Sequence, residues 1–194
     1  MLSWLDVLKL LVPVLTALGV IWIRHWYERR SERRFLEHGL IRGFQHEPLD
    51  AIGALSFIQL LRQRVEKGEA CVLHLRAPRV LLETAARLAS LDPHRAYLYY
   101  DYVGIAEDLN MTDTLLSQLM QTYHISHDQL SPRLKTAIQL ATTVMLKSHL
   151  NLDRRRLAIV QELAEHGLAR PDPQFLAHLR QCVAQAETAI AASR

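Results

Sequence analysis

The sequence has few of the residues that mark disulfide-rich domains, metal-binding domains or disordered chains. Its two cysteines, Cys71 and Cys182, are far apart and stand in no metal-ligand spacing, which argues against a disulfide framework and a zinc finger. Glycine and proline number seven each among 194 residues, so low complexity is not expected. A hydrophobic content of 49% is typical of one folded domain with a short appendage.

The sequence also lacks the short motifs of common enzyme active sites. No glycine-rich phosphate loop, H-E-x-x-H, G-x-S-x-G or kinase motif set occurs in it. We therefore predict no catalytic residue and no cofactor, and a non-enzymatic role is favoured. An enzymatic activity would require a site without a recognisable motif.

Positive charge is concentrated in one short segment. Of 23 basic and 20 acidic residues, five arginines and two glutamates fall in residues 24–34 and one residue of each sign precedes them. The remaining chain, from residue 35 onward, therefore holds 17 of each sign. Because the excess behind the pI of about 9.0 is confined to this segment, it indicates membrane topology rather than nucleic-acid binding.

A hydrophobic segment directly precedes the arginines. Residues 10–23 (LLVPVLTALGVIWI) carry no charge, and the apolar character extends back toward Met1. In one helix, the 18 residues between Trp4 and Trp22 correspond to about 27 Å, close to the roughly 30 Å hydrocarbon core of a bilayer. We therefore predict a transmembrane helix with aromatic residues at both interfaces.

Three alternatives fit this segment less well. A cleaved signal peptide needs positive charge before the apolar stretch, a surface-lying helix needs a polar face, and a buried core helix fits poorly beside the arginines. The positive-inside rule predicts an outside N-terminus and a cytoplasmic C-terminal domain, with the arginines near anionic headgroups. The predicted membrane-interface residues are Trp4, Trp22, Trp26, Tyr27, Arg24, Arg29, Arg30, Arg33 and Arg34.

The rest of the chain is predicted to be helical. Residues 1–34 form the anchor with its arginine-rich continuation, and residues 35–194 form a soluble all-α bundle of about six or seven helices. Residues 70–75 fit a short strand or a helix start equally well. The first helix is expected to end between Leu36 and Gly43, and later helix starts are expected near Pro48, Pro78, Asp92, Thr112 or Asp113, Pro132, Asn151 and Pro171.

Three clusters of polar residues are candidates for function. His124, His127 and Asp128 form the best group of possible metal ligands, but their spacing is a weak signal. Tyr99, Tyr100 and Tyr102 lie in a tyrosine-rich helix that either fills the core or presents a partner-binding surface. The three arginines at 154–156 are expected to be solvated or salt-bridged, with a phosphate site as the less favoured alternative.

One segment carries a resemblance. Residues 99–105 (YYDYVGI), together with a single N-terminal span and an arginine-rich continuation, resemble a group of uncharacterised bacterial single-pass proteins with a Tyr-Tyr-Glu/Asp-aromatic-Val motif. The resemblance covers this segment and the general layout. It implies the same membrane topology and no particular activity.

These observations favour a membrane-tethered interaction or scaffold protein that binds a protein partner or itself at the cytoplasmic face. One alternative is a pore-forming or membrane-disrupting effector, because Asp6, Lys9, Pro13 and Gly19 lie in the predicted span. A second alternative is a membrane-bound, metal-dependent hydrolase that uses the histidine cluster.

Overall fold

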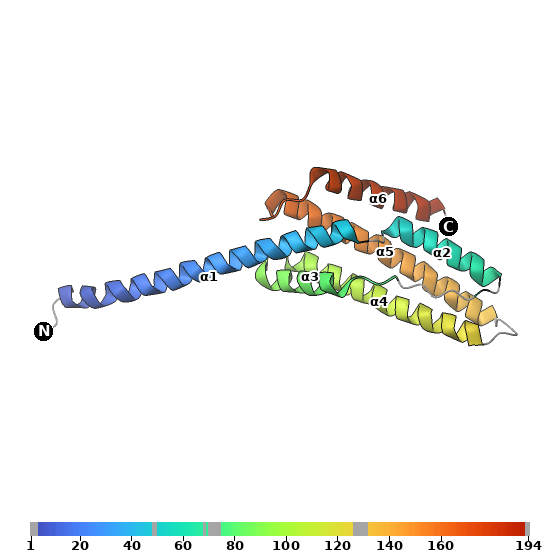
Figure 1. Cartoon of the computed structure of the whole chain (residues 1–194), viewed down its shortest axis with the longest axis horizontal. Helices are drawn as coiled ribbons and strands as arrows, with labels where there is room; N and C mark the ends of the chain where they lie inside the picture. Colours follow the sequence, from blue (N-terminus) through green and yellow to red (C-terminus); the bar gives the residue numbers. More distant parts are fainter. Residues whose placement is uncertain (1–3, 48–49, 68, 70–74, 126–131, 193–194) are drawn as a thin grey trace.

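The computed structural model describes the backbone of residues 4–47, 50–67, 69, 75–125 and 132–192, and the side chains of the same ranges except residues 4–10, 123–125 and 192. Within these ranges the secondary structure is α-helical without any β-strand, which confirms the all-α prediction. The helices, shown in Figure 1, are α1 (Trp4–His46), α2 (Ala51–Glu66), α3 (Arg79–Leu91), α4 (Ala96–Ile125), α5 (Pro132–His166) and α6 (Pro173–Ala192).

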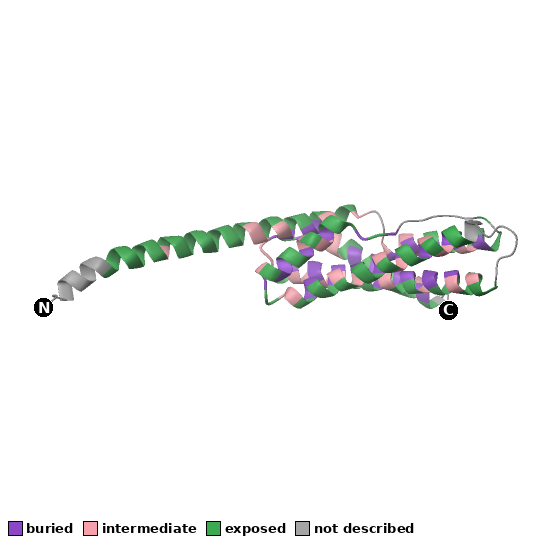
Figure 2. Ribbon diagram, turned by 90° about the horizontal axis from the view of Figure 1, so that it is seen from below, coloured by how far each residue is buried: buried purple, intermediate pink, exposed green. Residues whose placement is uncertain are grey.

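Helices α4 and α5 form an antiparallel pair around which the other helices pack (Figure 1). Helix α3 covers α4, whereas α2 and α6 contact each other and α5. The C-terminal part of α1 packs against α3 and α5. Its N-terminal part projects away from the bundle as an isolated helix (Figure 2). We call residues 4–30 the arm and residues 31–192 the body.

Helix α1 is longer than the sequence pattern suggests, since it passes through both Gly39 and Gly43 to His46. The predicted end of the helix near these glycines is therefore wrong. Gly43 has a packing role instead, because a Cβ atom at this position would lie 2.1 Å from Cδ2 of Leu81 on α3. Gly39 faces open space, with no atom within 4 Å of such a Cβ. Only one of the two glycines is thus required by the close approach of α1 and α3.

Helix α4 also continues through a predicted boundary. Asp113 does not begin a helix; its carboxylate accepts hydrogen bonds from the backbone amide of Leu75 at 2.8 Å and from Nε of Arg76 at 2.6 Å. The hydroxyl of Thr112 donates to the carbonyl of Asp108, one turn earlier in the same helix, at 2.9 Å. Both side chains are the types that cap helices, but here they stabilise a helix interior and an adjacent segment.

The boundary predicted at Asn151 is absent too, because α5 runs unbroken from Pro132 to His166. The capping acid in this region serves another helix: Oδ2 of Asp153 accepts from the backbone amide of Ala51, the first residue of α2, at 2.6 Å. The local N-cap, Asp50, accepts from the amide of Gly53 at 2.7 Å. Two carboxylates, from different parts of the chain, thus satisfy the free amides at the start of α2.

Other boundaries agree with the sequence pattern. Pro132 begins α5, Gly167 follows its last residue, and Pro173 begins α6, where Asp172 accepts a hydrogen bond from the amide of Gln174 at 2.9 Å. Pro78 is the N-cap of α3. The helix start predicted at Asp92 is displaced, because Asp92 is the C-cap of α3 and a turn separates it from α4, which begins at Ala96. The predictions for Pro48 and for residues 70–74 lie outside the described residues.

The two glycines of α1 allow a matched test of the contact with α3. Gly39→Ala and Gly43→Ala gain the same helix propensity, up to about 1 kcal/mol. Only Gly43→Ala forces the buried side chain of Leu81 to move, and such overpacking costs about 1–3 kcal/mol. We expect Gly43→Ala to be less stable than Gly39→Ala by this amount in urea unfolding of the full chain in non-ionic detergent. Equal stability of the two variants would contradict the close packing of α1 on α3.

Candidate functional site

The arm of α1 carries an apolar surface that no other described part of the chain covers (Figure 2). Every residue from 11 to 30 is exposed except Gly19, which is half-buried. Between residues 11 and 23, nine large apolar side chains expose 48–69% of their surface: Leu11, Val12, Val14, Leu15, Leu18, Val20, Ile21, Trp22 and Ile23. An uncovered patch of this kind is typical of a surface that binds lipid or another protein. The arm is therefore the leading candidate for a functional surface.

Among the residues that the structure describes, no helix is both long enough and apolar enough to cross a membrane. The predicted transmembrane helix includes residues 1–10, for which the structure gives at most the backbone. The side chains of Trp4, Asp6 and Lys9 lie outside the described set, so the predicted interface at Trp4 stays a prediction. The backbone itself is helical from Trp4 onward and continues through Pro13.

Aromatic and arginine side chains gather where the arm joins the body. Arg24 forms an ion pair of 2.9 Å with Glu28, one turn further along the helix. The guanidinium of Arg30 lies over the indole of Trp26, 5.1 Å from the ring centroid. In the described part of the chain, no carboxylate pairs with Arg29, Arg30 or Arg34. The predicted interface residues that are exposed here are Trp22, Trp26, Tyr27, Arg24, Arg29, Arg30 and Arg34.

Arg33 differs from the other arginines because it is half-buried and paired inside the protein. Its Nε lies 2.8 Å from Oε1 of Glu37, and another of its nitrogens lies 2.8 Å from Oδ2 of Asp92. Glu37 is fully buried, and its second oxygen accepts from the backbone amides of Leu168 and Ala169 at 2.6 and 2.9 Å. We call these five residues the clamp. It joins α1 to the α3–α4 turn and to the α5–α6 link.

Asp92 extends the clamp toward α5. Its carboxylate also pairs with Arg95 at 2.8 Å, and Arg95 pairs with Glu162 on α5 at 3.0 Å. Burial, reinforced by the negative charges of Glu37 and Asp92, raises the pKa of the Tyr99 phenol well above its ordinary value. The sequence patterns did not single out Glu37, and they marked Asp92 only as an expected helix start. The available signal was the four-residue spacing of Arg33 and Glu37, which is equally common on solvated helices.

The tyrosine-rich segment divides between the core and the surface. Tyr99 and Tyr102 expose only 1% and 0% of their surface, whereas Tyr100 exposes 58%. The ring of Tyr102 packs against Phe44 of α1, with centroids 5.2 Å apart. Of the three tyrosines predicted for partner binding, only Tyr100 is therefore accessible. Tyr99 and Tyr102 fill the core instead, which was the alternative interpretation of this segment.

The predicted metal cluster cannot be placed by side-chain geometry. His124 is in the last turn of α4 but its side chain, like all of His127 and Asp128, lies outside the described residues. Elsewhere in the described chain, no group of three histidine, cysteine or acidic side chains is arranged to hold a metal ion. The metal-site hypothesis therefore stays a prediction from sequence.

The arginines at 154–156 each pair with carboxylates. The first two pair with Glu187 on α6 at 2.7 Å and with Asp101 on α4 at 2.6 Å. The third, Arg156, is buried between Asp153, at 2.8 Å, and Glu47. Salt bridges therefore occupy the whole run, which agrees with the favoured sequence interpretation and leaves little free charge for a phosphate.

Arg156 and its partners form a buried ionic group where α1, α2 and α5 meet. Its guanidinium lies 5.9 Å from the ring centroid of Phe44. Burial raises the pKa of both Glu47 and Asp153, although the positive charge of Arg156 opposes this effect. Removing one member of such a group leaves an uncompensated buried charge, which costs about 3–5 kcal/mol. The group is thus a structural feature that fixes the body.

His149 lies near this group and is also buried. Neither ring nitrogen has a hydrogen-bond partner among the described atoms. Burial, together with the positive charge of Arg156, lowers the pKa of His149 to about 4. The histidine is therefore neutral in the folded protein at pH 7.

Comparison of the chain with protein-family models, with curated proteins and with solved structures finds no match. The resemblance to bacterial single-pass proteins accordingly stays a prediction from residues 99–105 and the general layout.

Two ion pairs of the same spacing on α1 allow a test of the clamp. Glu37→Gln places an amide group where the carboxylate accepts three hydrogen bonds, and we expect it to destabilise the protein by about 1–3 kcal/mol. Glu28→Gln removes the exposed partner of Arg24, and we expect a loss below about 0.5 kcal/mol. Urea unfolding of the full chain in non-ionic detergent measures both. Similar small losses would show that the clamp does not hold α1 on the body.

His149 gives the fold a dependence on pH. An ordinary histidine has a pKa near 6.5, so between pH 6.5 and 4 the unfolded chain binds more protons at this position than the folded one. Lowering the pH through this window therefore favours unfolding, by on the order of 3 kcal/mol for this group. We expect His149→Leu to lose less stability than the wild type between pH 7 and 4. The exposed His94→Leu variant is the control, and it should follow the wild type; an unchanged profile for His149→Leu would contradict the assignment.

Proposed function

We propose that this protein is a membrane-tethered helical module whose arm inserts into a lipid bilayer and whose body acts at the cytoplasmic face through a protein partner or self-association. The observation that carries the proposal is the exposed apolar surface of residues 11–23. Such a surface is unfavourable in water and requires a cover. The charge-balanced body and the absence of recognisable catalytic motifs in the sequence favour a binding role over an enzymatic one.

The amount of apolar surface supports lipid as the cover. Full burial of a valine, leucine or isoleucine side chain contributes about 1.5–3 kcal/mol. The nine large apolar side chains of the arm are about half exposed, so about half of this contribution remains to be gained on insertion. Inserting them into lipid gives on the order of 10 kcal/mol, which exceeds the marginal binding of a single acyl anchor. The free energy of transfer is therefore sufficient for stable attachment.

The shape of α1 supports a perpendicular attachment. The helix is unbroken from Trp4 to Trp22, which corresponds to about 27 Å, and the proposed span uses residues 1–10 in addition to the described apolar side chains. The arginines that follow it favour the cytoplasmic side for the body. In this orientation the clamp holds the body close to the membrane surface.

Charged residues placed in the arm should abolish attachment. Val12→Arg and Leu15→Arg together introduce two charges near the middle of the proposed span, at a cost of about 2.5–3.5 kcal/mol each. We expect flotation of the full chain with phosphatidylcholine vesicles to fall at least tenfold. The matched control is Leu140→Arg with Val144→Arg, which places the same charges at exposed apolar positions of α5, and it should float like the wild type. Equal flotation of the two double variants would overturn the proposal.

A further inference from the structure

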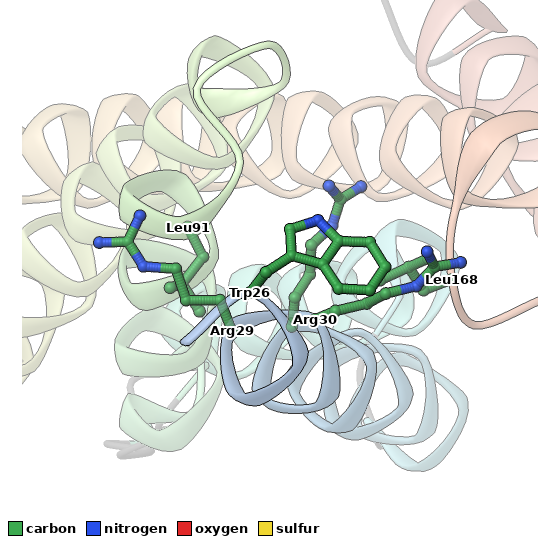
Figure 3. A pocket seen from close by; sticks show the side chains of 6 residues that line it. Trp26, Arg29, Arg30, Leu91 and Leu168 are labelled. Atoms are coloured by element: carbon green, nitrogen blue, oxygen red, sulfur yellow. The ribbon is translucent and has the colours of Figure 1, made fainter. Parts of the chain in front are cut away.

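A cleft lies at the base of the arm, on the end of the body from which α1 projects. Its volume is about 380 Å³, and its lining residues are Trp26, Arg29, Arg30, Arg33, Leu91 and Leu168. Figure 3 shows that these side chains come from three places: α1, the last residue of α3 and the α5–α6 link. Because the clamp joins the same three places, the walls of the cleft are held in fixed positions.

The cleft carries positive charge that the protein does not neutralise. Arg33 is paired with Glu37 and Asp92, whereas the described chain offers no carboxylate partner to Arg29 or Arg30. Arg30 is additionally held over the indole of Trp26, which limits its rotation. Figure 3 shows the Arg29 side chain directed away from Arg30, with the indole of Trp26 between them, so a phosphate in the cleft can pair with one guanidinium through hydrogen bonds while the other adds positive charge.

Apolar side chains also line the cleft. These are Leu91, Leu168 and the indole of Trp26, which lies between the two leucines in Figure 3. A free phosphate ion gains nothing from such a lining, because it has no apolar surface to bury. A phospholipid presents glycerol and acyl carbons next to its phosphate, so both the charged and the apolar side chains of the cleft would be used. The combination therefore favours a lipid over a free ion.

The position of the cleft along α1 also suits a headgroup. Arg29 and Arg30 follow Ile23, the last residue of the apolar segment, by six and seven residues, which corresponds to about 9–11 Å of helix. The polar layer of a bilayer extends roughly 5–8 Å beyond each side of the hydrocarbon core. With Ile23 at the edge of the core, the backbone of the two arginines lies just beyond the outer edge of this layer, and arginine side chains on a helix tilt back toward its N-terminus, within reach of the phosphates.

We infer that this cleft binds the phosphate of an anionic phospholipid, with Arg30 as its hydrogen-bond donor, Arg29 as a second positive charge in its lining, and Trp26, Leu91 and Leu168 as its apolar lining. The inference rests on the proposed membrane attachment, since the arm brings the cleft to the headgroups. It adds a defined lipid site to the general attraction between arginines and an anionic surface. The site sets a preference for lipid class that an apolar anchor alone does not have.

The test uses the full chain with Trp4→Phe and Trp22→Phe, which leaves Trp26 as its single tryptophan. The protein is held in neutral detergent micelles, so that binding does not depend on insertion into a bilayer. Titration with short-chain phosphatidylglycerol is expected to give a saturable change in Trp26 emission. Arg29→Gln with Arg30→Gln should weaken this binding at least tenfold.

The control is Arg24→Gln with Arg34→Gln, which removes the same charge from arginines that do not line this cleft, and it should weaken binding less than threefold. Equal weakening by both pairs would overturn the site in favour of diffuse attraction. An equal response to phosphatidylcholine would overturn the role of the anionic headgroup. Competition by inorganic phosphate at the same concentration would overturn the assignment to a lipid.

The vesicle flotation described above separates this inference from the proposed attachment. Loss of binding in micelles together with normal flotation on phosphatidylcholine would overturn the lipid site and leave the anchor. Normal, saturable binding in micelles without flotation would overturn the anchor and leave a site for phosphatidylglycerol.

Discussion

The buried carboxylate of Glu37 fixes the relation between the two parts of the molecule. One of its oxygens accepts from Arg33, and the other accepts from the amides of Leu168 and Ala169. A buried carboxyl group in this position is stable only while these donors are in place, because a buried polar group without hydrogen-bond partners is costly. Because the clamp fixes α1 on the body, it also fixes the direction in which the arm projects.

A second buried ionic group, at the opposite end of the packed part of α1, has a related effect. Arg156 on α5 lies between Glu47, directly after α1, and Asp153, which also accepts a hydrogen bond from the first amide of α2. The packed segment of α1 is thus held at both ends by charges and in between by Leu40, Ile41 and Phe44. Charges fix the register of α1, whereas apolar contacts supply most of the stabilisation.

The sequence predicts the helical class, the apolar arm and several helix ends, because these depend on local patterns. The helix starts predicted at Pro132 and near Pro171 are confirmed, since α5 begins at Pro132 and α6 at Pro173 and prolines act within one turn. The helix ends or starts expected at Gly43, Asp113 and Asn151 are wrong. Gly43 and Asp113 contact the distant residues Leu81 and Leu75, and Asn151 lies inside α5, which is one continuous helix. The lining of the cleft was beyond prediction for the same reason: Leu91 and Leu168 come next to α1 only after folding. Tyr99, Tyr100 and Tyr102 were grouped by their proximity in sequence, and the structure divides them, since Tyr99 and Tyr102 are buried whereas Tyr100 is exposed.

The continuity of α1 has a mechanical consequence. Its 43 residues form one rod of about 65 Å, without a hinge between the apolar segment and the clamp. If the arm is embedded as proposed, the bundle moves with the rod as a rigid lever. A change in tilt of about 10°, well within the range that bilayer thickness imposes on single helices, displaces the far end of the rod by about 11 Å. The thickness of the surrounding bilayer would therefore set the height and inclination of the bundle above its surface.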